Sequence, residues 1–263
     1  MAMLPNPLPT LADDPTGRSL GLDLPPGRLV DTTVDGPWHE PLLWYGDDPA
    51  APGTWDRLLP ARRAGGLHPV LIGGAPGPHE WELWPQRMSY PGDHDAEEVL
   101  AEYWESVAED GPDTDGWPGL APGSTFPEDP DRLAAATADA LSGGEGGDVL
   151  KGARPALVRA RRSADIPAAI GWCGPLDHEN DVARLCSVLR SWEDRFGIRV
   201  VGLSSDRLVL SVAAPPATTA DAGALAAEHL AFCPDNVRQG PGPGLGAYAR
   251  LLPGARVWTF WWD

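Results

Sequence analysis

The chain has 263 residues, of which 38 are acidic and 20 basic, so its formal net charge is −18, and 42% of its residues are hydrophobic. That hydrophobic share can build a core, which excludes a wholly disordered chain. The acidic balance argues against a nucleic-acid binder that works by neutralising phosphates. No stretch approaches the ~18 consecutive apolar residues of a membrane span. Residues 1–15 lack the basic and then apolar layout of a secretory signal.

The cysteines point to a reducing compartment. Cys173, Cys186 and Cys233 are odd in number and form no C-x-x-C pair. A disulfide framework and a self-contained zinc site are therefore both disfavoured. We expect a cytoplasmic protein without a metal or another cofactor. The prevalence of Gly, Ala, Pro and Arg is typical of a high-GC bacterial genome.

The charge is concentrated in the first part of the chain. Residues 1–150 carry 27 acidic and seven basic side chains, whereas residues 151–263 carry 11 acidic and 13 basic ones. Residues 93–148 alone hold 16 Asp and Glu against a single basic residue, Arg132. A solvated acidic face is the simpler interpretation of this pattern. The alternative hypothesis is a docking surface for a basic protein partner. The sequence indicates neither a nucleic acid nor a membrane as partner, and it leaves the oligomeric state open.

Strand and helix patterns are short in the first half. Residues 1–27, rich in Pro, Gly and Asp, predict an irregular arm. A Pro- and Gly-rich loop over residues 111–130 indicates a linker or a lid, and the glycine-rich run after Ser142 indicates a flexible break. The strands expected here are Arg28–Val34, Pro41–Tyr45 and Pro69–Ile72. Three helices are expected: one that Thr54 caps and Gly65 ends, one over residues 95–110 and one over residues 132–141.

The second half is more regular, and its elements predict an α+β fold on a mixed or largely antiparallel sheet with packed helices. The strands expected are Pro155–Arg161, Ile198–Leu203, Leu208–Val212 and Arg256–Trp262, and the helices are Val182–Phe196, Thr218–Phe232 and Leu245–Leu252. We therefore expect a smaller, acidic N-terminal region of α/β type over residues 28–147 and a C-terminal domain over residues 154–263.

Three short patterns resemble ligand-binding loops but lack residues or geometry that the ligand requires. Gly242–Ala247 matches a dinucleotide fingerprint, but Pro243 lies inside it and no strand precedes it. Gly73–Gly77 lacks the Lys-Ser/Thr of a phosphate loop. Residues 110–116 imitate part of a calcium loop, but the first and last carboxylate ligands are missing. Asp93 and Asp95, which flank His94, fit the capping of the helix that follows.

One cluster of chemistry-bearing residues remains, Glu228 to Asn236. On a helix, His229 and Cys233 are four residues apart and could approach one another, with Asp235 or Asn236 as orienter of the imidazole. The same pair could form half of a zinc site, with His178 or Cys173 completing it. The preferred interpretation is core packing, because cysteine is among the most buried residue types. The candidate binding set is Glu228, His229, Cys233, Asp235, Gln239, Trp258 and Trp262.

The end of the chain, Val257–Asp263, is strongly aromatic. As a strand it places Trp258, Phe260 and Trp262 on one face and Trp261 on the other. We expect a central strand covered on both sides. The alternative is an exposed binding patch.

Four segments carry a family resemblance: Ser191–Gly197, Leu208–Pro216, Ala227–Gly240 and Val257–Asp263. With their EH-x-x-FCPD and terminal WWD pieces, residues 165–263 resemble the bacterial domain-of-unknown-function family 4253. That resemblance implies a recurring C-terminal domain and no catalytic residues. We expect a non-catalytic binding module with an accessory or immunity-like role. The alternatives are a Cys/His or metal-assisted hydrolase centred on His229, Cys233 and Asp235, and a regulatory domain that binds a small ligand near Trp258 and Trp262.

Overall fold

The computed structural model describes residues 5–73, 77–108, 116–143, 150–240 and 244–263. Their main feature is a seven-stranded sheet in the order β1-β4-β6-β5-β7-β8-β9. Only β5 and β7 are parallel neighbours, and every other pair is antiparallel. The strands are β1 Gly27–Val30, β4 Leu43–Gly46, β5 Leu67–Ile72, β6 Arg154–Arg159, β7 Ile198–Leu203, β8 Arg207–Val212 and β9 Val257–Trp261. The α+β prediction with a mixed, largely antiparallel sheet is confirmed.

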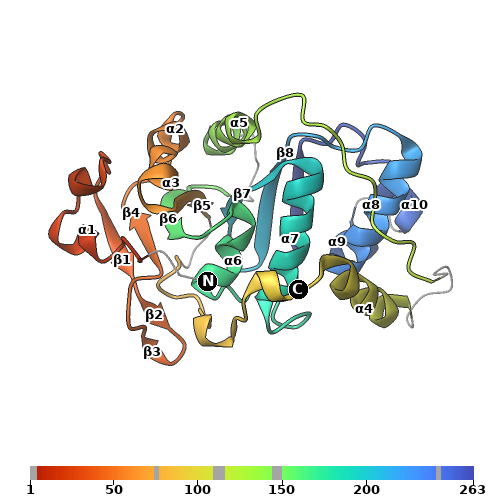
Figure 1. Cartoon of the computed structure of the whole chain (residues 1–263), viewed down its shortest axis with the longest axis horizontal. Coiled ribbons are helices and arrows are strands. Elements are labelled where there is room, and N and C mark those ends of the chain that lie inside the picture. The colour runs from red at the N-terminus through yellow and green to blue at the C-terminus, as the bar shows by residue number, and fades with distance from the viewer. Residues whose placement is uncertain (1–4, 74–76, 109–115, 144–149, 241–243) are drawn as a thin grey trace.

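The helices lie on both faces of this sheet, and a small hairpin of β2 Thr32–Thr33 and β3 Gly36–Pro37 stands apart from it (Figure 1). The helices are α1 Thr10–Asp13, α2 Thr54–Leu58, α3 Pro60–Gly65, α4 Ala96–Ala108, α5 Pro130–Ser142, α6 Ile166–Ile170, α7 Val182–Phe196, α8 Thr219–Phe232, α9 Pro234–Arg238 and α10 Leu245–Ala249. Within the described residues no helix is long and apolar enough to cross a membrane.

The largest core lies between the sheet and α7. That helix has nine buried residues, and its apolar stripe packs on alternate residues of β7, β8 and β9. On the other face, α5 contributes three buried alanines against Leu71, Val201 and Val209. The alternation along each strand explains both layers, because neighbouring residues point to opposite faces of a sheet.

The described part of the irregular arm, residues 5–27, is packed against the sheet. Leu8, Leu11, Leu22 and Leu24 are buried against Trp44 and Leu157 of the sheet. Its only helical pieces among the described residues are α1 and a single 3-10 turn at Arg18–Leu20. The arm therefore covers part of the sheet despite its lack of long regular structure.

Two local expectations need correction. The N-cap of α2 is Gly53, not Thr54, whose hydroxyl instead accepts a hydrogen bond from the Ala51 N–H. A single helix from Thr54 to Gly65 is also wrong: α2 ends at Leu58 and α3 begins at Pro60. Proline lacks the N–H needed to continue a helix but fits a first turn. For the same reason α8 ends at Phe232, and Pro234 starts α9.

Strands from both parts of the chain form one sheet. β5 comes from the N-terminal part, yet it lies between β6 and β7 of the C-terminal part. Helix α4 likewise packs on α7 and α8, at the opposite end of the molecule from α1 (Figure 1). The division into domains near residue 147 stays a prediction. The calcium-like loop and the glycine-rich run at 144–147 lie outside the described residues, apart from Gly116.

The expectation of a central terminal strand is wrong. β9 is the last strand of the sheet, and among the described strands it pairs only with β8. Trp258 and Phe260 are buried on the face that α7 and α8 cover, whereas Val257 is 42% exposed. One covered face therefore explains Trp258, Phe260 and Trp262, whereas Trp261, on the other face, is half-buried. On the other face α5 packs against β7 and β8.

Candidate functional site

His229 lies inside an aromatic cluster. Its ring centroid is 4.6 Å from that of Trp258, 4.9 Å from that of Trp192 and 4.9 Å from that of Phe260. The side chain is fully buried, and its Nδ1 forms a 2.9 Å hydrogen bond with the Tyr248 hydroxyl. Burial lowers the pKa of His229 to about 3. The imidazole is therefore neutral at physiological pH.

Cys233 does not form the expected pair with His229. It is the residue after α8, and its backbone angles, φ −150° and ψ 86°, are not helical, so the helical spacing of four residues no longer applies to it. Its thiol is fully buried and donates to the Trp261 carbonyl oxygen at 3.0 Å. Burial raises the pKa of the Cys233 thiol to about 12. A thiol in that state is protonated and is a poor nucleophile.

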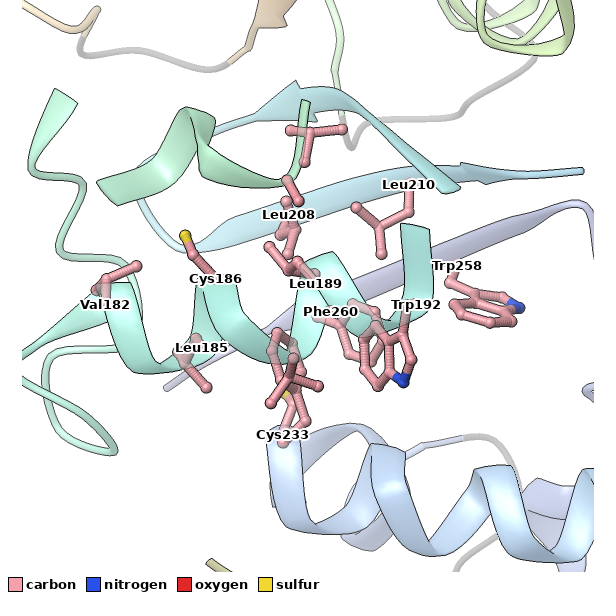
Figure 2. Packing of buried hydrophobic residues seen from close by; sticks show 14 of the residues in the cluster. Val182, Leu185, Cys186, Leu189, Trp192, Leu208, Leu210, Cys233, Trp258 and Phe260 are labelled. Carbon is pink, nitrogen blue, oxygen red and sulfur yellow. The ribbon is translucent and has the colours of Figure 1, made fainter. Parts of the chain in front are cut away.

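Figure 2 shows how these residues are arranged. Trp192 of α7 lies beside Phe260 of β9, with ring centroids 5.5 Å apart, and Cys233 stands at the end of α8 that faces them. Trp262 closes the cluster by an edge contact with Phe232 at 5.7 Å. The predicted site residues of α8 and β9 are thus together, as parts of one core.

The zinc candidates are not gathered around this pair. His178 packs on Tyr103 with ring centroids 4.9 Å apart, and the thiol of Cys173 donates to the Glu82 carbonyl oxygen. In the part of the chain that the structure describes, no group of three or more His, Cys, Asp or Glu side chains could hold a metal ion. Asp235 is half-buried and accepts hydrogen bonds from the Gln239 side chain at 3.0 Å and from the Asp263 N–H at 3.4 Å.

Glu228 forms a buried ion pair that the sequence analysis did not identify. Its fully buried carboxylate accepts two bonds from the Arg195 guanidinium, at 2.5 and 2.8 Å. The Trp192 indole N–H donates to it at 2.7 Å and the Ala121 backbone N–H at 2.6 Å. Arg195 also donates to the Ala121 carbonyl oxygen at 2.7 Å. The pair therefore fastens the loop around Ala121 onto α7 and α8. The sequence placed Glu228 in the candidate binding set and both residues in segments of the family resemblance, but it did not pair Glu228 with Arg195.

Helix α4 presents an acidic face to solvent. Its apolar residues Val99, Leu100, Tyr103, Trp104 and Val107 are buried in the main core. The opposite face carries four exposed glutamates, of which Glu102 pairs with Arg184 at 2.5 Å. The other three, Glu97, Glu98 and Glu105, have no ion-pair partner among the described residues. This face is the largest run of exposed carboxylates that a described helix carries.

A pocket of about 400 Å³ opens between the first turn of α4 and α7. Three arginines line it, but each has its own carboxylate: Arg190 pairs with Asp165 at 2.5 Å, Arg195 with Glu228 at 2.5 Å, and Arg162 with Asp194. Asp95 and Glu97 also line the pocket, and in the described structure no cation pairs with either of them. The charge left over at this end of α4 is therefore negative.

The sequence of the C-terminal part of the chain matches a domain family of unknown function. Residues 154–263 match the family described as Domain of unknown function (DUF4253), so this part of the chain is a DUF4253 domain. The match covers the predicted C-terminal domain and includes α7, α8 and β9. No curated protein and no solved structure matches the chain significantly.

Proposed function

We propose that the protein is a non-catalytic interaction module that binds a basic protein partner through the acidic face of α4. The observation that carries this proposal is the row of exposed glutamates Glu97, Glu98 and Glu105, which have no cation of their own in the described structure. Unpaired surface carboxylates repel one another, and a basic partner would relieve that repulsion. An accessory or immunity-like role in the bacterial cytoplasm fits such a module.

The way α4 is held supports this role. The Tyr103 hydroxyl donates to Glu179 at 2.6 Å, and the Arg238 guanidinium donates to the Val107 carbonyl oxygen at 3.2 Å. These bonds tie both the middle and the end of α4 to the DUF4253 domain. A helix fixed in this way keeps its carboxylates at constant spacing, so little ordering entropy is lost on binding.

The pocket at the start of α4 adds to the same surface. Because its arginines are already neutralised by Asp165, Glu228 and Asp194, its free charges are the carboxylates of Asp95 and Glu97. A lysine or arginine side chain of the partner would find a negative potential there as well as along the helix. The surface is therefore complementary to a basic partner over its whole length.

Among the described residues, the contacts of His229 and Cys233 do not favour the alternative hydrolase. His229 and Cys233 are fully buried, and they bond to Tyr248 and to the Trp261 backbone instead of to each other. Trp258 and Trp262, the residues proposed for a small ligand, are buried in the same aromatic cluster.

The test compares two variants of equal net charge. Glu98→Lys/Glu105→Lys reverses the α4 face, and Asp13→Lys/Asp23→Lys reverses two exposed carboxylates at the opposite end of the molecule. Binding of a fluorescent oligolysine peptide is followed by anisotropy between about 0.01 and 0.15 M salt, where the Debye length falls from about 30 to 8 Å.

We expect the α4 variant to bind the peptide at least ~10-fold more weakly than the wild type and the control variant to lose less than ~3-fold, because the potential of a surface patch dominates docking. Equal losses in the two variants would mean that the peptide senses only net charge, and the proposal would be abandoned. Binding that does not weaken with salt would also contradict it.

A further inference from the structure

β9 is an edge strand whose sequence strongly favours pairing with another strand. Its residues Val257–Trp261 contain no charge, no proline and no glycine, and they are β-branched or aromatic throughout. A free edge of this kind is a template for pairing with another chain. The molecule therefore needs some feature that keeps the outer side of β9 from pairing.

Asn236 occupies the place of a neighbouring strand. Its side-chain Nδ2 donates to the Thr259 carbonyl oxygen at 2.5 Å, and its Oδ1 accepts from the Trp261 N–H at 3.1 Å. The side-chain amide thus bonds to the two residues that flank Phe260. One residue of a neighbouring parallel strand makes the same pair of bonds through its own N–H and C=O groups.

The surrounding turn extends this contact along the edge. The Cys233 thiol donates to the Trp261 carbonyl oxygen at 3.0 Å, and the Asp263 N–H donates to Asp235 at 3.4 Å. Asn236 itself is only 7% exposed, because α9 lies against β9. The FCPDN segment and the terminal WWD segment are therefore partners in one contact.

We infer that Asn236 is an edge cap, which prevents a second copy of this chain from adding to the sheet at β9. A second copy is the occupant that the geometry favours, because antiparallel pairing of β9 with itself about Thr259 is two-fold symmetric and brings together two uncharged strands. The inference does not depend on the proposed function.

The test first removes the Asn236 side-chain hydrogen bonds and then blocks strand pairing at β9 by a second substitution. Asn236→Leu has a similar size and makes neither hydrogen bond, and Asn180→Leu is the control at an exposed asparagine. Mass is measured by size-exclusion chromatography with light scattering over a concentration series. We expect the wild type and Asn180→Leu to stay monomeric and Asn236→Leu to form a dimer whose share rises with concentration.

A second substitution distinguishes dimerisation by strand pairing at β9 from nonspecific hydrophobic association. The Thr259 N–H faces the same side as its carbonyl oxygen, which bonds to Asn236, because both groups of a residue in an antiparallel strand point to one side. Thr259→Pro deletes that N–H, and proline is tolerated at such an edge. Asn236→Leu/Thr259→Pro is therefore expected to return to a monomer.

A dimer of the wild type through β9, a monomeric Asn236→Leu, or a dimer that survives Thr259→Pro would each overturn the inference. If Asn236→Leu loses its cooperative unfolding transition, amide hydrogen exchange of the wild type decides. The capped Trp261 N–H is expected to exchange at least ~100-fold more slowly than the uncapped Thr259 N–H, in line with protection by a buried hydrogen bond. Equal exchange rates at the two amides would refute the cap.

Discussion

Replacing Glu228 with glutamine removes the charge from one half of a buried ion pair. The Arg195 guanidinium, whose side chain is 15% exposed, would keep its charge without a carboxylate. The amide nitrogen that replaces one carboxylate oxygen would also face a donor, since all four hydrogen bonds of Glu228, from Ala121, Trp192 and Arg195, are donated to its carboxylate. Breaking a buried pair by removing one partner costs about 3–5 kcal/mol.

Urea unfolding followed by tryptophan fluorescence measures this loss. With a slope of about 2–3 kcal/mol per molar urea, the midpoint of Glu228→Gln should fall by roughly 1–2.5 M. Glu98→Gln is the matched control, because Glu98 is exposed and a surface change of this kind alters the free energy of unfolding by less than about 0.5 kcal/mol. A midpoint for Glu228→Gln within the error of this control would refute the description of the pair as buried and essential.

Two further predictions concern acid stability and backbone geometry. Because the pKa of His229 is about 3 in the folded protein and 6.5 as its ordinary value, the unfolded state binds more protons between these values, and stability falls as the pH drops below about 6.5. At about pH 4.5 the free energy of unfolding, measured by urea titration, should be roughly 3 kcal/mol lower than at neutral pH because of His229. His229→Gln should remove this part of the pH dependence; the same dependence of unfolding free energy on pH in the variant and the wild type would contradict the prediction. Gly171→Ala should lower the melting temperature far more than Gly152→Ala. Both have left-handed backbones at φ +66° and +65°, but only at Gly171 would a Cβ lie 2.2 Å from the Pro85 nitrogen; equal losses would refute the clash.

Local pattern was enough to predict most helices and strands. The stripe of α7 and the alternation of β8 are properties of neighbouring residues, and the structure places both elements close to their expected bounds. The caps of α7 and α8 follow the same logic, since the Thr218 hydroxyl accepts from the Asp221 N–H and Gly197 ends α7 in a left-handed conformation. Such signals act over a few residues, so the sequence contains them directly.

The candidate site was predicted only in part. The sequence brought His229, Cys233 and Asp235 to attention because they are chemistry-bearing types in one short segment. It could not predict that Cys233 bonds to Trp261, which is 28 residues away, or that Glu228 bonds to Ala121, which is 107 residues away. Contacts over such separations depend on how the elements pack, and no local pattern encodes them.

The sequence by itself determined the kinds of element, the acidity of the first 150 residues and the identity of the C-terminal domain class. Only the tertiary structure decided that β5 lies between β6 and β7, that the acidic helix α4 rests on the DUF4253 domain, and that β9 is an edge strand closed by Asn236. The physical reason is that helix and strand formation follow the period of neighbouring side chains, whereas strand order and burial follow from which distant apolar faces can cover one another.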